Sequence, residues 1–341
     1  MSVQNAKIIY DQLKEFGLTR AQVRKLLPAW WVPEAEKHAD GIAELCALIG
    51  RRLSLDTAAL MNGQVKRKAA ASLAYKHRVD ATPQSLQGAT SIALSLAAAV
   101  AEAITTPYTP IPNSPEVFAE QVRKAGGGLV GLRSLIATCW TMGIPVVPMP
   151  NLPVGLRKMD GAVINVNNRP VILISKKKSS QAWLAFIVAH EIGHIGRGHL
   201  DKNGSIIDVS LQEQATYETD ADGDQQEREA DDYALGLLGG KALENVVATW
   251  STRATPAEIA LNARKSHQAF GVETGHLVLR YAFKTKRWPE AVSALKYLQE
   301  DADAEVVMRD ALLRNLDLDL IADDLRDLVL QVTGIEESTV D

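Results

Sequence analysis

A five-residue pattern, His190-Glu191-Ile192-Gly193-His194, constrains this chain more than any other feature. Residues four apart on an α-helix are turned by only about 40° and raised by about 6 Å, so both imidazoles leave the same face. Two such nitrogens can bind Zn²⁺, and the neighbouring glutamate can accept a proton from the attacking water. The pattern therefore predicts a hydrolytic metal site, with His190 and His194 as ligands and Glu191 as general base.

The motif needs a third ligand, and the nearest downstream residues do not supply one in a known register. A metzincin would have glycine and histidine where this chain has Arg197 and Leu200, and His199 misses the register by one residue. A thermolysin-like site instead takes a carboxylate from a second helix. The spacing therefore directs the search further along the chain.

The segment Glu227-Arg228-Glu229-Ala230-Asp231 lies in a predicted helix and offers that carboxylate. We expect Glu227 to complete a gluzincin-like set of two histidines, one glutamate and Zn²⁺. Glu229 is the alternative ligand. Asp231, one turn after Glu227, is expected to accept a hydrogen bond from a ligand imidazole.

Residues 115–285 resemble the ImmA/IrrE family of metallopeptidases. The resemblance is carried by the segments CWTMGIPV at 139–146, KMDG at 158–161, AWLAFIVAHEIGH at 182–194 and EREADDYA at 227–234. It implies a zincin-like, zinc-dependent endopeptidase. Some members of that family cleave a helix-turn-helix repressor, so the implied partner is a protein substrate of this regulatory kind.

The expected fold class is α+β, with a small sheet in the metallopeptidase domain and helical regions before and after it. Residues 105–115 carry four prolines, and we expect a linker there. The predicted domains are 1–104, helical; 116–250, the metallopeptidase core; and 251–341, a helical extension. Strands are expected at 144–149, 162–166 and 171–175, with a hairpin turn at 167–170. Helices are expected over 64–104, near 180–196 and at 225–238, and acidic loops over 201–226.

Several further residues are candidates for roles at the site. We expect the oxyanion to be stabilised by His199, Tyr217 or Tyr233, although a packed tyrosine with a bonded hydroxyl is the simpler interpretation. Cys139 is either an inhibitory thiolate switch or a small buried hydrophobic residue. Residues 218–229 follow the spacing of a calcium-binding EF-hand, but a solvated acidic loop explains them better. Lys176, Lys177 and Lys178 follow an expected edge strand that could hold substrate, and they could steer an acidic segment or simply protect the edge.

Composition places the chain among globular proteins of the cytoplasm. It is 46% hydrophobic and 23% charged, and its two cysteines give no disulfide framework. The first residues lack the pattern of a secretory signal, and no apolar stretch is long enough to span a bilayer. Cytoplasmic localisation without a membrane partner is therefore expected.

The front of the chain raises a second hypothesis. Residues 1–80 carry 13 Lys and Arg against 8 Asp and Glu. The segment 17–23 resembles the start of a helix-turn-helix, and 42–60 is a second candidate, but Pro28, Trp30, Trp31 and Pro33 fall where a recognition helix should begin. The alternatives are thus DNA binding, as in a transcriptional regulator or antitoxin-like protein with a metallopeptidase-like scaffold, and a helical docking module. An autoinhibited protease is a third possibility.

Overall fold

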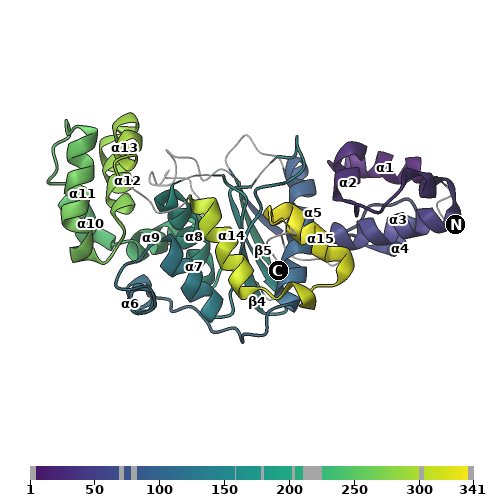
Figure 1. The fold of residues 1–341 in the computed structure, drawn as a ribbon, viewed down its shortest axis with the longest axis horizontal. Helices are drawn as coiled ribbons and strands as arrows, with labels where there is room; N and C mark the ends of the chain where they lie inside the picture. Colours follow the sequence, from purple (N-terminus) through teal and green to yellow (C-terminus); the bar gives the residue numbers. More distant parts are fainter. Residues whose placement is uncertain are drawn as a thin grey trace.

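A small mixed sheet lies at the centre of the molecule, with helices around it (Figure 1). The computed structural model describes residues 5–68, 73–77, 83–157, 159–177, 180–201, 204–209, 225–298 and 303–336. The five strands run in the order β1-β5-β3-β4-β2. Their bounds are β1 Leu73–His77, β2 Val146–Pro148, β3 Gly161–Val166, β4 Arg169–Ile174 and β5 Ser205–Val209. The α+β class is therefore confirmed.

The antiparallel hairpin β3–β4 matches the sequence prediction. Asn167 and Asn168 form its turn with φ values of 51° and 66°. Positive φ at both central residues suits the right-handed twist of the strands, and asparagine tolerates it better than most residues. The turn chemistry thus fixes the register of the two strands beside the motif helix.

Two strands were not expected. β1 falls in a segment predicted to be helical, and β5 falls in the predicted acidic loop. β5 pairs antiparallel with β3, and β1 pairs parallel with β5. Both predictions were wrong because these short segments become strands through pairing partners far away in the sequence, which local patterns do not reveal.

The expectation of an edge strand at 171–175 was also wrong. β4 pairs with β3 on one side and with β2 on the other, so its backbone is already bonded in both directions. Lys176 forms an ion pair with Asp160 at 2.9 Å and thereby fixes the residue before β3. Lys178 lies outside the described residues.

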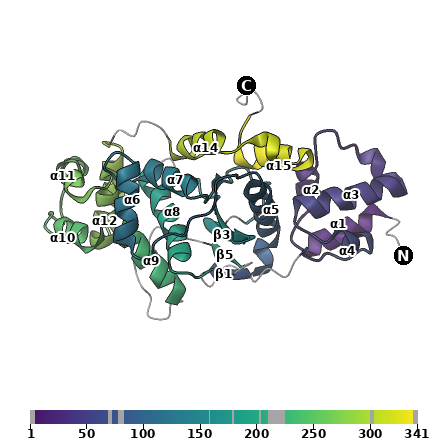
Figure 2. The same ribbon diagram turned by 90° about the horizontal axis from the view of Figure 1, so that it is seen from below.

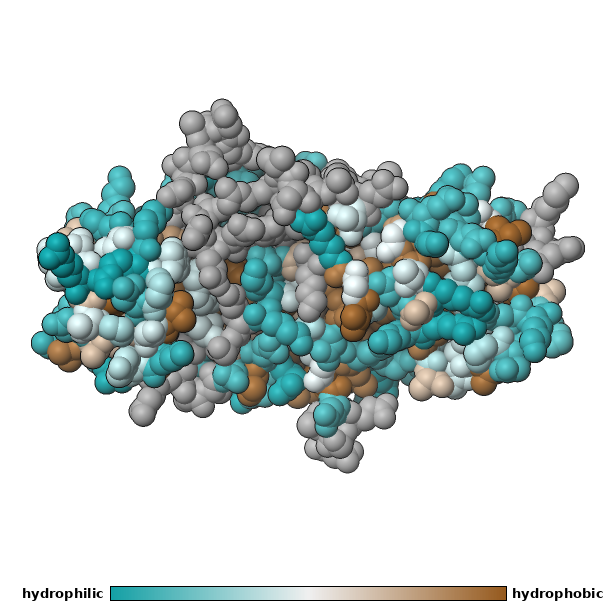
Figure 3. All heavy atoms as spheres, turned by 90° about the horizontal axis from the view of Figure 1, so that it is seen from above, coloured by the Kyte–Doolittle hydropathy of each residue, from teal (hydrophilic) through white to brown (hydrophobic). Residues whose placement is uncertain are grey.

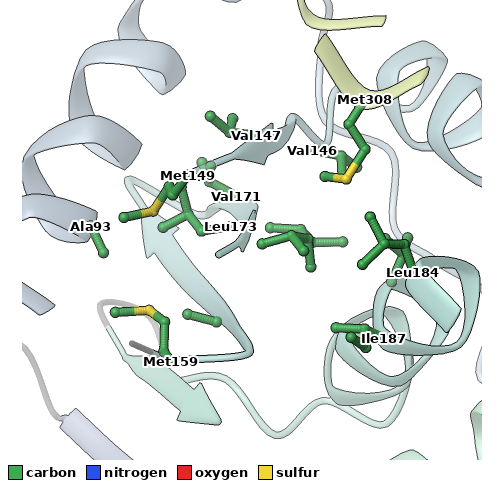
Figure 4. Packing of buried hydrophobic residues seen from close by; sticks show 14 of the residues in the cluster. Ala93, Val146, Val147, Met149, Met159, Val171, Leu173, Leu184, Ile187 and Met308 are labelled. Carbon is green, nitrogen blue, oxygen red and sulfur yellow. The ribbon is translucent and has the colours of Figure 1, made fainter. Parts of the chain in front are cut away.

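The sheet is covered on both faces. Figure 4 shows Ala93 of α5 (Pro83–Glu102) on one side, and Leu184 and Ile187 of α8 (Gln181–Gly196) on the other. Met308 of α14 (Ala304–Asn315) extends this second layer over Val146. Because β2, β3 and β4 are buried on both faces, they consist mostly of apolar residues.

The remaining helices lie at the two ends of the molecule, beside the motif helix, and in a C-terminal segment from α14 to α15 that we call the strap. One end contains α1 Ala6–Glu15, α2 Arg20–Leu26, the 3₁₀ helix η1 Pro33–Lys37, α3 Ala39–Arg52 and α4 Thr57–Met61. The other contains α10 Gly240–Val247, α11 Pro256–Phe270, α12 Thr274–Thr285 and α13 Trp288–Leu295. Next to the motif helix lie α6 Pro115–Ala125, α7 Leu132–Thr141 and α9 Gln225–Leu237, and the chain finishes with α14, η2 Leu318–Leu320 and α15 Asp323–Thr333. Figure 2 shows α14 and α15 running along the sheet toward the N-terminal helices.

The strap is attached to the N-terminal helices by a buried cation. Arg52 is 1% exposed, donates to the carbonyl oxygen of Leu26 at 2.6 Å and pairs with Asp327 of α15. Gln331, also on α15, donates to the carbonyl oxygen of Lys25 at 2.7 Å. The end of the chain therefore stabilises its beginning against the sheet.

The predicted linker follows the surface of the core. Thr109 donates its backbone N–H to the carbonyl oxygen of Met142 at 2.8 Å, and Pro112 accepts a hydrogen bond from Tyr233. Upstream of the linker, α5 packs on β3 and β4. The domain boundaries themselves stay predictions.

On the face shown in Figure 3, hydrophilic residues predominate and hydrophobic ones lie in small groups among them. Within the described residues, every helix is too short or too polar to cross a bilayer. Cys46 and Cys139 are both buried free thiols.

A buried imidazole couples the fold to pH. His276 on α12 is 4% exposed, and burial, together with nearby Arg280, lowers its pKa to about 3. Above its unfolded-state pKa of about 6.5, neither state binds the proton and the fold keeps its full stability. Below that pH the unfolded chain binds a proton that the folded chain cannot, so the free energy of unfolding falls as the pH is lowered toward 3.

We therefore predict that lowering the pH from 7 to 5.5 costs the wild-type fold about 1 kcal/mol more than it costs His276→Gln. Urea unfolding at the two pH values measures this difference. His38→Gln, at an exposed position, is the matched control and should keep the wild-type pH dependence. The same pH dependence in wild type and His276→Gln would contradict the prediction.

Candidate metal centre

The motif helix α8 is buried along almost its whole length. All residues from 181 to 194 are buried, because the sheet, α7, α9 and α12 surround them. At its first turn, Trp183 stacks on Trp288 with ring centroids 5.7 Å apart and meets Phe283 edge-on. A helix that is apolar all round belongs in a core, and here this burial holds the motif in place.

Helices α8 and α9 cross closely enough to share one site. A Cβ on Gly193 would lie 2.7 Å from the carbonyl oxygen of Ala230, and one on Gly196 would lie 2.9 Å from the ring of Tyr233. Both distances are well below van der Waals contact, so a larger residue at either position would push the helices apart. The two glycines therefore set the separation at which Glu227 reaches the histidines.

His190, His194 and Glu227 bring three ligand atoms together. The two Nε2 atoms are 3.1 Å apart, and each faces a different oxygen of Glu227: His190 Nε2 lies 3.4 Å from Oε2, and His194 Nε2 lies 3.4 Å from Oε1. Among the described residues, these three form the group of His, Cys, Asp and Glu side chains that could hold a metal ion. Glu229, the alternative ligand, instead pairs with His199.

The spacing of these atoms fits Zn²⁺. Ligands about 2.05 Å from a tetrahedral zinc ion are separated from one another by about 3.3 Å. The 3.1 Å between the two Nε2 atoms and the 3.4 Å from each of them to one oxygen of the Glu227 carboxylate are close to that value. Two imidazole nitrogens and one carboxylate are also the donor set that zinc accepts in hydrolytic sites.

Each of the two imidazoles contacts a neighbouring side chain through Nδ1, the nitrogen that does not face Glu227. His190 Nδ1 lies 2.8 Å from Asp231 Oδ1, and because a carboxylate only accepts, that nitrogen carries the proton. His194 Nδ1 lies 2.9 Å from Nδ1 of His199. The expected contact between Asp231 and a ligand imidazole is thus present.

The charges around the site favour a cation. Burial disfavours the charged form of His190, but the carboxylates of Asp231 and Glu227 outweigh that effect and raise its pKa well above the usual range. A bound metal ion satisfies the same carboxylates. The charges and the distances at this site therefore both favour binding of a metal cation.

Glu191 occupies a tightly defined place next to the sheet. Its side chain is fully buried, and a Cβ on Gly161 would lie 1.9 Å from its Oε1. Gly161 starts β3 and is paired with Ile174 on one side and Asp208 on the other. The missing side chain at position 161 thus makes room for the Glu191 carboxylate.

The remaining residues that the sequence suggested for the site are either buried in packed positions or outside the described residues. Tyr233 is buried and donates its hydroxyl to the carbonyl oxygen of Pro112 at 2.7 Å, as a packed tyrosine does. Cys139 is fully buried, and burial raises its pKa to about 12, so it is a thiol at neutral pH. Tyr217 and the first seven positions of the EF-hand pattern lie outside the described residues.

Sequence reasoning missed three features of the site. It did not identify Gly161 as space for Glu191, the two glycines as the helix contact, or His199 and Glu229 as partners. A signal existed for the helix contact, because Gly193 and Gly196 lie three residues apart and face Ala230 and Tyr233, also three apart. No local signal links Gly161 to Glu191.

No protein-family model matches the chain, and searches of curated proteins and of solved structures also gave no match. What the structure shows is a buried His-His-Glu cluster consistent with a zinc site of the H-E-x-x-H plus glutamate type.

The cluster predicts which carboxylate on α9 matters for metal binding. Glu227→Ala should lower Zn²⁺ affinity by more than about 100-fold, since the loss of outer-sphere partners alone costs 10- to 100-fold. Competition with a chromophoric chelator measures this affinity. Asp232→Ala removes an exposed carboxylate from the same helix and should bind zinc like the wild type. Equal affinities in the two variants would exclude Glu227 as a ligand.

Proposed function

We propose that this chain is a zinc-dependent endopeptidase of the gluzincin-like type, similar to the ImmA/IrrE metallopeptidases, and that it cleaves a helix-turn-helix repressor or a similar regulatory protein. The convergence of His190, His194 and Glu227 carries the proposal. The general-base candidate Glu191 lies on the same helix, adjacent in sequence to His190. The repressor substrate rests on the family resemblance.

The roles of the side chains follow from their chemistry. Zinc, when bound by the two histidines and Glu227, supplies Lewis-acid polarisation of the peptide carbonyl and of water. Glu191 accepts the proton of the attacking water and passes it to the leaving amine. Asp231 holds His190 in the tautomer whose Nε2 is a ligand.

DNA binding has less support. Arg20 and Arg24 of α2 both pair with Glu36, at 2.5 and 3.2 Å, so these cations are already engaged. Trp30 and Val32, each more than half exposed, follow α2 where a recognition helix would begin. We therefore favour a helical docking role for this end of the chain.

Glu191→Gln tests the general base. This variant should bind Zn²⁺ like the wild type but cleave 10²- to 10⁴-fold more slowly, because the amide cannot accept the proton. The substrates to use are the small helix-turn-helix protein encoded beside this gene, where there is one, and a quenched fluorescent peptide library. Glu244→Gln, an exposed position on α10, is the control. Cleavage by Glu191→Gln at the wild-type rate would show that the assignment is wrong.

Gly161→Ala tests the position of the same carboxylate. The added methyl group should displace Glu191 while the ligands on α8 and α9 stay in place. We expect unchanged zinc affinity and at least tenfold slower cleavage. Combined with Glu191→Gln, the alanine should cause little further loss, because both changes act on one group. Full additivity of the two losses, or wild-type activity in Gly161→Ala, would contradict this account.

A further inference from the structure

His199 lies where the chain leaves the motif helix, and both of its ring nitrogens are engaged. Its side chain is 5% exposed, and its backbone N–H donates to the carbonyl oxygen of His194 at 3.0 Å. Nδ1 lies 2.9 Å from His194 Nδ1, and Nε2 lies 2.9 Å from Glu229 Oε2. We infer that His199 and Glu229 form a hydrogen-bonded relay that orients His194 and fixes its tautomer for metal binding.

The protons in this relay are fixed by elimination. The Glu229 carboxylate only accepts, so Nε2 of His199 carries a proton and donates it. In the neutral imidazole the other nitrogen, Nδ1, is then an acceptor. His194 Nδ1 must therefore donate to it, which leaves the Nε2 lone pair of His194 directed toward Nε2 of His190 and toward Glu227. This arrangement of protons satisfies both ring nitrogens of His199, and it leaves the Nε2 lone pairs of His190 and His194 facing each other and Glu227, where a bound metal ion would accept them.

Helix α9 thereby supplies both outer-sphere carboxylates as well as a ligand. Asp231 accepts directly from His190, whereas Glu229 acts on His194 through the His199 ring. Gln225 donates to Oε1 of Glu229 at 2.7 Å, which leaves Oε2 for His199. Hydrogen bonds of this kind raise the basicity of a ligand imidazole and hold its orientation.

This arrangement gives His199 a role different from the oxyanion contact expected from the sequence. Since Nδ1 meets His194 and Nε2 meets Glu229, His199 acts through a ligand and is a positioning residue. The inference rests on the metal site of the proposed function but does not depend on the substrate.

Zinc affinity of the metal-free full-length chain tests the relay. His199→Phe keeps a ring but removes both nitrogens, and we expect a 10- to 100-fold loss of Zn²⁺ affinity in chelator competition. His199→Gln should recover part of that loss, because its amide oxygen can accept from His194 and its amide N–H can donate to Glu229. Glu229→Ala, at a partly exposed carboxylate, should weaken Zn²⁺ binding without unfolding the chain. The control Asp232→Ala should bind Zn²⁺ like the wild type.

A spectroscopic measurement separates positioning from simple packing. In ¹⁵N NMR of the zinc-loaded wild type, His194 should be protonated at Nδ1, and Glu229→Ala should perturb that resonance. Wild-type affinity in both His199→Phe and Glu229→Ala, with an unchanged His194 tautomer, would overturn the relay. Failure of the wild type to bind zinc would instead overturn the proposed function, and the relay with it.

Discussion

The separation between α8 and α9 is the constraint on which the candidate metal centre depends. The H-E-x-x-H helix alone offers two nitrogens, while α9 supplies Glu227 and both outer-sphere carboxylates. A displacement of α9 would therefore move all three carboxylates at once. Glycine in the interior of a helix costs about 1 kcal/mol relative to alanine, so Gly193, inside α8 and against the backbone of Ala230, reflects a demand for space.

Burying the polar groups of this site costs free energy, and hydrogen bonds to specific side chains offset that cost. His190 and His194 are each at most 1% exposed, and each has its Nδ1 bonded to a neighbouring side chain. In a medium of low dielectric constant such contacts are strong, and losing one partner leaves the other desolvated. The apolar surroundings that fix α8 in the core thus also strengthen the hydrogen bonds and charge interactions of its two histidines.

The sequence was most informative where chemistry depends on residues of one helix or on a turn. The spacing of His190 and His194, and the two asparagines of the hairpin, follow from local geometry, so both could be predicted. The choice of Glu227 over Glu229 required the rotation of α9 relative to α8, which the sequence suggested only through the family-like pattern. β1 and β5 could not be predicted, because β1 pairs with β5 and β5 pairs with β3, and these partners are distant in the sequence. The roles of Gly161 and His199 depend on contacts between segments distant in sequence or across a helix end, and they became visible only in three dimensions.

The arrangement of the strands limits how an extended substrate could approach. A peptide can bind an enzyme by adding to an open sheet edge, but β3 is paired with β5 on one side and β4 on the other. In the described part of the sheet the outermost strands are β1 and β2, and β2 packs against α14 and α15. β1 is two strands, or roughly 10 Å, from β3, which contacts Glu191. The pairing of β3 on both sides therefore leaves no open edge beside Gly161 to which an extended peptide could add. β1 comes from the segment between the N-terminal helices and α5, so the N-terminal part of the chain supplies the strand that covers β5 and forms this outer edge of the sheet.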